Sequence, residues 1–414
     1  MSSTTAYVPV IGTGAVCAAG YGVDNGFEAV AEGKDGLTPL TVLDSGLKQI
    51  PLCGQVPQKP EIRIGDKTPD ATSAFALWAA KEALMDIPDA GGFRLGLVLA
   101  TTIGGLTRSE QFYRVLREKP EYVRHAAAQA AYHEPTATAG TVARLVGAHG
   151  FHTISTACST GLHAIGMAKR LVDQGAYDLC LAVGSDALAM LTVRGFASLM
   201  LIDFDGCKPF DKRRVGISLG EGAGAVLLAS RNAAGKLGCT PHASVAGWGA
   251  SADCHHMTAP HPEGRGARLA IQRALREAGI EPGAIGLVAA HGTATPDNDV
   301  SEITAMRAVF DELPPFCSMK RTLGHTLAAS GTLEAVFAVR AIQEGIIPAT
   351  GGFDQIDDAI HATPAPKGPA DLKYVLKNSF GFGGNNAAVV FAKEEGPDGP
   401  LQNTSQKKAA APYP

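Results

Sequence analysis

The sequence of 414 residues predicts an α/β fold made of two related halves. A chain of this length exceeds what a single hydrophobic core usually serves. Hydrophobic residues make up 45% of it and charged residues 18%, with 49 glycines, which is typical of a tightly packed globular protein and excludes disorder for most of the length. The third observation is that the order of apolar segments repeats once along the chain.

Five pairs of segments carry this repeat, in the same order in both halves. They comprise β-rich runs, helical patterns, uniformly apolar runs typical of buried parallel strands, strand–loop–helix units and final strands. The pairs are 6–22 with 241–256, 71–87 with 267–280, 93–105 with 283–295, 151–172 with 316–342, and 220–230 with 383–393. Such a duplication predicts two sheets, each covered by helices, with a site where corresponding strand ends meet.

The repeat also predicts the organisation of the chain. We expect an N-terminal half over 1–240, a C-terminal half over 241–393, and a disordered or appended polar tail over 394–414. Segment 106–150 interrupts the first half, so it is expected to cap the site or to join a dimer contact.

Charge and cysteine usage narrow the class of protein. A net charge of −4 and a pI near 6.3 argue against nucleic-acid binding by the whole chain. The eight cysteines lack CxxC spacing and lie mostly in apolar runs, which favours reduced thiols in a cytosolic protein over a disulfide framework. Neither a signal peptide nor a membrane span is recognisable, so the protein is expected to be cytoplasmic.

Cys158 is the candidate nucleophile. It lies in the string FHTISTACSTGLHAIGMAKRLV, where a strand pattern ends in small residues and a helical pattern begins. Unpaired N–H groups at the start of a helix favour a thiolate over a thiol and can also bind an oxyanion. A free cysteine is more often a small buried core residue, and only additional residues favour the reactive interpretation.

Two histidines supply that additional signal. His291, in VAAHGTATPDNDVSE, and His325, in MKRTLGHTLAASGTLEA, are each expected directly after an apolar strand, in equivalent places of the two halves. Either histidine alone would more often be structural. Together with a cysteine at the start of a helix they predict one site. Asp299 and Glu302 follow His291 and are expected to orient its loop or to cap the next helix.

These motifs resemble a known family. TACSTG around Cys158, HGTAT around His291, MKRTLGHTLAASG around Lys320 and His325, and NSFGFGGNNA at 378–387 are similar to the elongating β-ketoacyl-[acyl carrier protein] synthases of the thiolase superfamily. The resemblance runs from about residue 7 to 393. It implies a duplicated, five-layered αβαβα thiolase fold and a decarboxylating Claisen condensation of malonyl carrier protein with an enzyme-bound acyl thioester, in fatty acid, polyene or polyketide elongation.

The resemblance also implies roles for individual residues. Cys158 would carry the acyl group, and its N–H with that of Phe382 would form the oxyanion hole. His291 and His325 would hydrogen-bond the malonyl thioester. Lys320 would complete the catalytic set by a buried ion pair with Glu334, which supports the His325 loop.

Substrate contacts follow from the same resemblance. Thr293 and Thr295 would bind the pantetheine arm, and Ile103 would shape the far end of the acyl pocket. The glycine-rich loop would act as a gate in which Phe382 blocks that pocket, its substrate-contacting residues being Phe380, Gly381 and Gly383.

The implied partners are an acyl carrier protein and either an identical subunit or a chain-length-factor-like subunit. The family needs no metal and no cofactor of its own, because the carrier protein brings the phosphopantetheine arm. Carrier proteins are acidic, so basic residues are candidates for docking, although a solvated face is the simpler interpretation. These residues are Arg63, Lys67, Lys208, Lys212, Arg213 and Arg214.

Departures from the family pattern favour a specialised pathway. Ile217 replaces a common phenylalanine, Asn298 stands where glycine is usual, and 124–135 is unusually rich in alanine and histidine. These features are more similar to ketosynthases of polyene pathways, such as aryl polyene clusters, than to the housekeeping enzyme.

Other functions are less consistent with the residues. A thiolase-type acyltransferase needs a second cysteine in the last glycine-rich loop, which has none, and a non-catalytic chain-length partner would have lost the nucleophile. Initiating synthases use Cys, His and Asn. The string DCHHMTAPH at 253–261 is a poor zinc site because adjacent residues rarely reach tetrahedral positions. GTGAVCAAG at 12–20 lacks the spacing of a dinucleotide fingerprint.

Overall fold

The computed structural model describes residues 7–58, 62, 69–87, 92–124 and 131–394. Its centre is a sheet of eleven strands, ten of them in the order β6-β5-β7-β8-β1-β9-β15-β14-β10-β11. The strands of the first half are β1 (Val8–Cys17), β5 (Leu95–Ala100), β6 (Gly150–Ile154), β7 (Leu179–Asp186) and β8 (Gly222–Ala229). Those of the second half are β9 (Ala243–Ala252), β10 (Leu287–Ala289), β11 (Phe316–Cys317), β14 (Tyr374–Gly381) and β15 (Asn385–Ala392).

The strand order confirms the duplication. Read outward from the centre, β1, β8, β7, β5 and β6 correspond to β9, β15, β14, β10 and β11, with the same parallel and antiparallel pairings in each half. Each predicted pair of segments falls on one corresponding pair of elements. The two predicted sheets are the two β layers of the fold, but they are not independent, because β1 and β9 pair over Val8–Val10 and Ala243–Val245 and join them into one hydrogen-bonded sheet.

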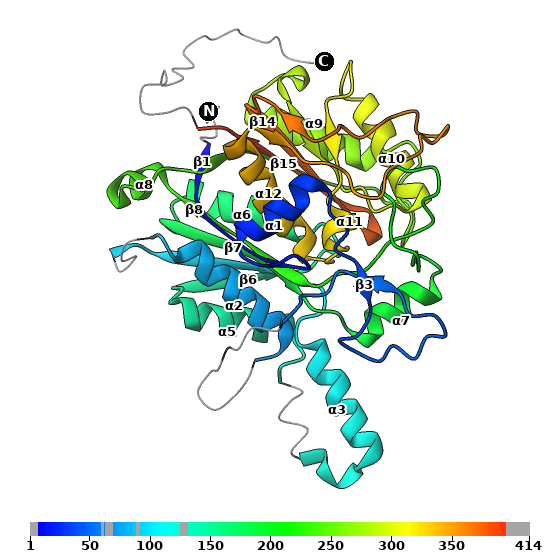
Figure 1. The fold of residues 1–414 in the computed structure, drawn as a ribbon. Coiled ribbons are helices and arrows are strands. Elements are labelled where there is room, and N and C mark those ends of the chain that lie inside the picture. The colour runs from blue at the N-terminus through cyan, green and yellow to red at the C-terminus, as the bar shows by residue number, and fades with distance from the viewer. Residues whose placement is uncertain (1–6, 59–61, 63–68, 88–91, 125–130, 395–414) are drawn as a thin grey trace.

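Helices cover the sheet in layers (Figure 1). Helices α6 and α12 pack against each other and against strands of both halves, whereas α2 and α5 cover the first half and α9 and α10 the second, which makes the fold the five-layered αβαβα one. The helices are α1 (Val23–Glu32), α2 (Ala71–Leu84), α3 (Leu106–Glu118), α5 (Pro135–Val146), α6 (Thr160–Asp173), α7 (Met190–Ser198), α8 (Arg231–Leu237), α9 (Arg265–Ala278), α10 (Pro296–Arg307), α11 (Lys320–Leu323) and α12 (Ala329–Glu344).

Short elements complete the chain. The strand β2 (Gly20–Tyr21) pairs antiparallel with the end of β1. Two small two-stranded sheets lie outside the main sheet. They are formed by β3 (Thr38–Pro39) with β4 (Leu52–Cys53) and by β12 (Ile346–Ile347) with β13 (Gly368–Pro369). The 3-10 turns are η2 (Pro120–Tyr122), η3 (Pro282–Ala284) and η4 (Phe382–Gly384).

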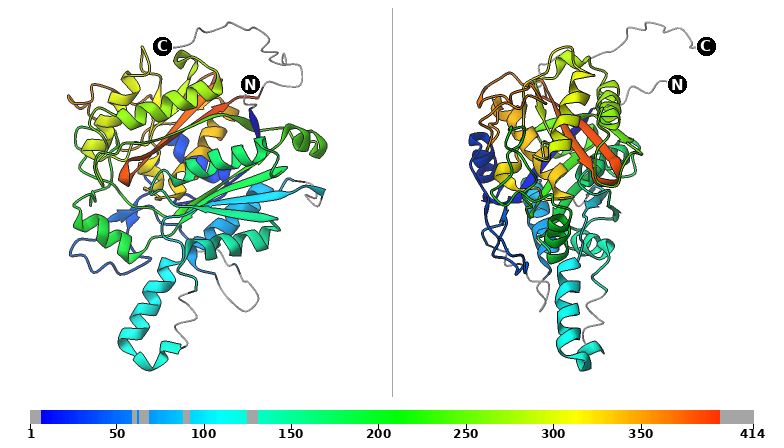
Figure 2. Two further views of the ribbon diagram at one scale, coloured as in Figure 1. Left: turned by 180° about the vertical axis from the view of Figure 1, so that it is seen from behind. Right: turned by 90° about the vertical axis from the view of Figure 1, so that its right-hand side faces the viewer.

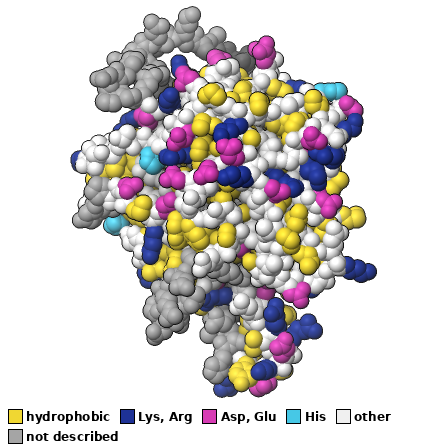
Figure 3. Space-filling model, viewed as in Figure 1, with side chains coloured by type: hydrophobic (Ala, Val, Ile, Leu, Met, Phe, Trp, Pro, Cys, Tyr) yellow, Lys and Arg dark blue, Asp and Glu magenta, His cyan; other side chains and the backbone are white. Residues whose placement is uncertain are grey.

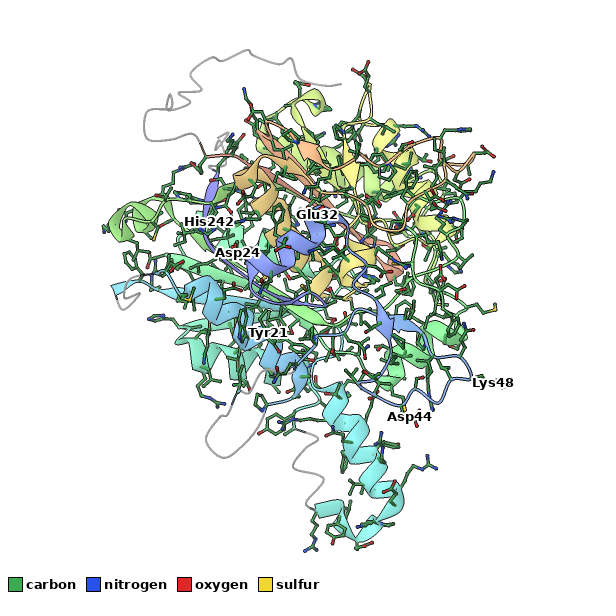
Figure 4. All side chains as sticks on the ribbon, viewed as in Figure 1. Tyr21, Asp24, Glu32, Asp44, Lys48 and His242 are labelled. Atoms are coloured by element: carbon green, nitrogen blue, oxygen red, sulfur yellow. The ribbon has the colours of Figure 1, made fainter. Side chains whose placement is uncertain are left out.

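Local sequence explains the main elements. All six residues of β5, LGLVLA, are buried, as a parallel strand covered on both faces requires. The side chain of Asp70 caps α2 by accepting a hydrogen bond from the N–H of Ser73 at 3.0 Å. At the two ends of α1, Asp24 and Glu32 (Figure 4) form ion pairs with Arg340 of α12 and with Lys367.

The interrupting segment 106–150 has two parts. Helix α5 packs against α2 and β6, whereas α3 projects from the body as an arm (Figures 1 and 2) and has no buried residue. Residues 125–130 lie outside the described residues, as does the predicted tail from 395 onward. Glu394 is held in place, because it accepts a hydrogen bond from Ser244 and pairs with Arg231.

Candidate active site

Cys158 lies in a tight turn between β6 and α6. The preceding residue, Ala157, has a φ of +52°, a left-handed conformation that side-chain-bearing residues rarely adopt. Two hydrogen bonds hold the turn, from the N–H of Thr156 to Oγ1 of Thr160 (2.9 Å) and from Oγ of Ser159 to the carbonyl of Thr156 (2.9 Å). The predicted strand–turn–helix setting of the cysteine is therefore confirmed.

Two helix starts bring the halves together at this turn. A Cβ atom on Gly161 of α6 would lie only 2.5 Å from the main-chain nitrogen of Thr332 in α12. A Cβ on Gly331 would lie 2.6 Å from the nitrogen of Leu162. Only glycine fits at both positions, so α6 and α12 approach closely just below the nucleophile.

His325 lies beside the sulfur. Its Nε2 atom is 3.0 Å from Sγ of Cys158, and both side chains are buried. Two main-chain hydrogen bonds fix its position, from its N–H to Ser218 (2.7 Å) and from the N–H of Gly220 to its carbonyl (2.9 Å). The expectation that His325 directly follows a strand is wrong in detail, because the short helix α11 (Lys320–Leu323) separates it from β11.

His291 follows β10 directly, as predicted. Its ring lies 5.5 Å from the ring of His325, nearly perpendicular at 81°, and 5.8 Å from the ring of Phe380. Glu302 orients the loop, since its carboxylate accepts hydrogen bonds from the N–H groups of His291 and Gly292, both at 2.8 Å. Three side chains from distant parts of the chain thus meet in one place.

The rest of the HGTAT loop is held by Asp299. Its carboxylate accepts hydrogen bonds from the N–H groups of Phe210 (2.7 Å) and Ala294 (3.2 Å). Burial raises the pKa of this carboxyl group to about 6. Neither acid caps the next helix. That cap is Thr295, which accepts a hydrogen bond from the N–H of Asn298 (3.3 Å) and lies 3.1 Å from the hydroxyl of Thr293.

A buried charge cluster lies behind the histidines. Glu334 of α12 pairs through Oε1 with Lys320 at 2.5 Å, as predicted, and through Oε2 with Lys377 of β14 at 2.8 Å. Lys320 also donates to the carbonyl of His291 at 2.9 Å. The second lysine was not predicted, because a single lysine in the strand pattern YVLKNSF looks like a solvent-facing residue.

Burial controls the protonation of the site. It raises the pKa of the Cys158 thiol to about 12, although Lys320 and the N–H groups of Phe382 and Cys158 itself act in the opposite direction. The expected preference for thiolate is therefore wrong for the free protein. Burial and then Lys320 lower the pKa of His325 to about 3 and that of His291 well below its usual range. Both imidazoles are neutral at pH 7.

The glycine-rich loop closes over the sulfur. A Cβ on Gly381 would lie 2.9 Å from the carbonyl oxygen of Thr156, so the loop can approach the nucleophile turn only with glycine there. Gly383 has a φ of +77°. The Phe382 ring packs against Phe196 of α7 at 5.5 Å between ring centroids. The N–H groups of Cys158 and Phe382 both act to lower the pKa of the Cys158 thiol.

These side chains line a single pocket. Cys158, both histidines, Thr293, Thr295, Phe380, Gly381 and Phe382 all contribute to it. Sequence reasoning missed further lining residues, which are Phe196, Leu201, Asp253, Thr258, Pro260 and Asn386. Ile217 and Asn298, noted as departures from the family pattern, also line it. Ile103 is buried in the core of the first half and is absent from this lining, as are all described residues of 106–150.

Comparison with known proteins agrees with this geometry. Residues 6–234 match the β-ketoacyl synthase N-terminal domain, and residues 242–354 match the β-ketoacyl synthase C-terminal domain. The chain is 31% identical to 3-oxoacyl-[acyl-carrier-protein] synthase 2 of Staphylococcus aureus strain N315, over 94% of this chain and 98% of that protein. The chain belongs to the β-ketoacyl synthase family.

Solved structures of β-ketoacyl synthases have the same fold. The ishigamide ketosynthase/chain length factor is 28% identical with a TM-score of 0.86, covering 94% of this chain and 99% of that chain. A type II PKS acyl-carrier protein in complex with its ketosynthase bound to the hexaketide is 27% identical with a TM-score of 0.84, at the same coverage of both chains. This β-ketoacyl synthase therefore has the thiolase fold that its motifs predicted.

The basic residues proposed for carrier docking differ in exposure. Arg214 is buried, with 7% of its surface exposed, and pairs with Asp357, so its inclusion in a docking surface is wrong. Arg213 is about half exposed and pairs with Asp211 at 2.8 Å. Lys208 pairs with Asp203 at 2.9 Å and Lys212 with Asp358 at 3.1 Å. Arg63 and Lys67 lie outside the described residues.

Other expectations concern metals, thiols and membranes. All eight cysteines are free thiols. Within the described ranges, no three His, Cys, Asp or Glu side chains cluster as a metal site would require, and this includes 253–261. Among the same residues, no helix combines the length and the apolarity needed to cross a bilayer. Basic and acidic side chains are interspersed on the face shown in Figure 3.

Proposed function

We propose that this β-ketoacyl synthase condenses malonyl carrier protein with an acyl group held on Cys158. The observation that carries the proposal is the 3.0 Å contact between His325 and the sulfur, in a pocket that also contains His291 and lies under Phe382. A neutral imidazole beside a protonated thiol can accept its proton as the sulfur attacks an acyl thioester.

In the first step, the Cys158 sulfur bonds to the acyl carbonyl carbon while its proton passes towards His325. The N–H groups of Cys158 and Phe382 bind the oxyanion of the tetrahedral intermediate, and one such donor is worth roughly 10²–10³ in rate. The intermediate then collapses, the carrier thiolate leaves and takes up the proton. The product is an acyl-enzyme and a free carrier thiol.

In the second step, malonyl carrier protein binds with its thioester carbonyl between His291 and His325. Hydrogen bonds from both imidazoles stabilise the enolate that forms as the carboxylate leaves as carbon dioxide. The enolate carbon attacks the acyl-enzyme carbonyl, a carbon–carbon bond forms, and the carbon–sulfur bond to Cys158 breaks. The thiolate regains a proton, which restores the resting enzyme with a chain longer by two carbons.

Thr293 and Thr295 line the pocket and are proposed to bind the pantetheine arm. Ile103 does not line this pocket, and its place at the far end of the acyl chain is proposed from the family resemblance alone. We propose no metal and no cofactor beyond that arm. We propose a cytoplasmic location for the reaction. Pairing with a chain-length-factor-like subunit is proposed by analogy with the ishigamide ketosynthase/chain length factor, and an identical subunit is the alternative. The type II PKS ketosynthase complex supports polyketide elongation, and polyene elongation is proposed from the sequence departures noted above.

One experiment tests the proposal. The purified chain is incubated with a panel of acyl carrier proteins, the mass of the Cys158 peptide is measured, and malonyl carrier protein is then added. We expect an acyl adduct on Cys158, followed by its loss and a β-ketoacyl product. An adduct without condensation would indicate a thiolase-type acyltransferase, and no adduct from any donor would indicate a non-catalytic partner subunit.

A further inference from the structure

Lys377 is a buried lysine whose contacts all lie around the histidine pair. Its side chain is fully buried in the middle of β14, although it does not line the pocket. Its Nζ atom donates to the carbonyls of Ala290 (3.1 Å) and Asn378 (2.5 Å) and lies 2.8 Å from Oε2 of Glu334. A buried ammonium group is costly unless it is paired and hydrogen-bonded, so these contacts hold a specific geometry.

The two lysines hold consecutive carbonyl groups. Lys377 binds the carbonyl of Ala290 and Lys320 binds that of His291, at the point where β10 ends and the catalytic loop begins. Glu334 connects them, with one carboxylate oxygen on each ammonium group. Because Asn378 directly follows Lys377 and donates to Glu302 at 3.1 Å, the same strand also contacts the carboxylate that orients the His291 loop.

We propose that Lys377 is a second positioning lysine for the pair His291 and His325. It shares Glu334 with Lys320 and holds the main chain at the start of the His291 loop. The cluster of Lys320, Lys377 and Glu334 then has one excess positive charge beside the two imidazoles. The inference rests on the proposed function, because it assigns Lys377 to the decarboxylation step. It assigns Lys377 no contact with the N–H groups of Cys158 and Phe382 that bind the oxyanion in acylation. At neutral pH, His325 remains the neutral proton acceptor of that step whether or not Lys377 is present, because its pKa is about 3.

Electrostatics supports this assignment. Burial lowers the pKa of both His291 and His325 the most, and the positive charge of Lys320 comes next. The positive charge of Lys377 is a further cause that lowers the pKa of both histidines. A neutral imidazole can still donate one N–H hydrogen bond and carries no charge that the two ammonium groups would repel. An imidazolium beside the same two ammonium groups would be strongly disfavoured by charge repulsion. The titratable groups around the pair are Cys158, Glu302 of α10, Lys320 of α11, Glu334 of α12 and Lys377 of β14.

The test compares two half-reactions in Lys377→Met and in a matched control. Acylation of Cys158 is followed by mass, and release of carbon dioxide from malonyl carrier protein is measured from about pH 3 to pH 9, because the pKa of His325 is about 3. The control is Lys393→Met, which removes a lysine just after the neighbouring strand β15 whose side chain is half exposed and paired with Asp371. Thermal unfolding of each variant reports on folding.

We expect Lys377→Met to slow decarboxylation about 10-fold at neutral pH and to move the acid limb of its pH profile upward by about 1 unit, because the imidazoles protonate more readily. Acylation should stay within about twofold of wild type, and Lys393→Met should change neither reaction. An unchanged decarboxylation rate and pH profile would overturn the proposal. So would an equal loss in both reactions without a pH shift, which would mean a purely structural role.

A double variant keeps the test decisive if Lys377→Met does not fold. Lys377→Met with Glu334→Gln removes one positive and one negative charge, so the cluster keeps its single excess positive charge on Lys320. Its acid limb should lie at the wild-type position, and an acid limb about 1 unit or more above that of wild type would contradict the proposal. Failure of wild-type protein to release carbon dioxide or to be acylated would instead refute the proposed function.

Discussion

Nε2 of His325 lies 3.0 Å from Sγ of Cys158, although the two residues are 167 positions apart in the chain. The contact joins a turn of the first half to a loop of the second. It exists because α6 and α12 cross at two glycines and because Ser218 and Gly220 fix the main chain of His325. The predictions below concern this contact and the groups that surround it.

Replacing Cys158 by Ala removes the sulfur and leaves both histidines in place. We expect acyl transfer and condensation to fall by on the order of 10³-fold or more, because no other group in the pocket can form the thioester. Carbon dioxide release from malonyl carrier protein should persist. Adduct mass and product formation measure the first effect, and condensation at the wild-type rate would disprove the mechanism.

Replacing each histidine by Ala separates the two half-reactions. His291→Ala should slow decarboxylation by about 10²–10³-fold and leave acylation nearly unchanged, since His291 has no contact with the sulfur. His325→Ala should slow decarboxylation by a similar factor and also slow acylation, because the proton acceptor beside the thiol is lost. Single-turnover assays of each half-reaction give the comparison. Equal acylation rates in the two variants would contradict the proposed roles.

The raised pKa of Cys158, about 12, predicts slow alkylation of the free enzyme. Below that value the thiolate fraction rises about tenfold per pH unit, so the rate of modification by iodoacetamide should keep rising from neutral pH to about pH 10 without a plateau. Rates are measured from the mass of the Cys158 peptide, with the exposed Cys254 as an internal reference. A plateau near neutral pH would show that the thiolate is already formed in the free protein.

Breaking the Lys320–Glu334 pair should lower stability. Lys320→Met leaves a buried carboxylate with Lys377 as its one remaining cation, and we expect a loss of about 3–5 kcal/mol in the free energy of unfolding. The pKa of Glu334 is lowered to about 2, so its contribution is complete above its unfolded-state value near 4.5 and is lost as pH falls towards 2. Urea unfolding at several pH values measures both effects. Equal stability of Lys320→Met and wild type would contradict this assignment.

Arg213 remains a candidate for carrier docking. Arg213→Gln removes an exposed charge without placing an acid beside Asp211, and we expect the KM for acyl carrier protein to rise about 3-fold to 10-fold while small thioesters are unaffected. Lys393→Gln, which removes a similarly exposed cation that is also paired with an aspartate, is the matched control. If Arg213→Gln has the same KM as wild type at low salt, Arg213 is not part of the docking surface.

Much of the fold could be predicted from the sequence, because each half must bury its own strands and helices. Apolar runs such as LGLVLA at 95–100 and the helical spacing of 267–280 therefore repeat visibly. Joining of the halves through β1 and β9 could not be predicted, since it depends on a short edge pairing that leaves no pattern. The sequence motifs predicted the site residues that bear reactive groups, such as Cys158 and the two histidines. They did not predict Lys377, whose side chain points inward from a strand.

The basic run at 208–214 illustrates the remaining difficulty. Consecutive charged residues look alike in a sequence, but the chain turns Arg214 towards Asp357 and leaves Arg213 half exposed. The acid that pairs with the buried Arg214 lies 143 residues away along the chain, whereas Arg213 pairs with Asp211 two residues away. The protonation of Cys158 was misjudged for a similar reason, because the helix start was visible and the depth of burial was not.

The pairing of β1 with β9 has a consequence for biosynthesis. As the ribosome releases the chain, the first strand emerges long before its neighbour at 243–252, and α12, which packs beneath both halves, emerges later still. The apolar edge of β1 and the thiol of Cys158 are therefore made before the segments that cover them. They lack these neighbours while more than a third of the chain is still to be translated. The active site can therefore be completed only after the last strands have been made.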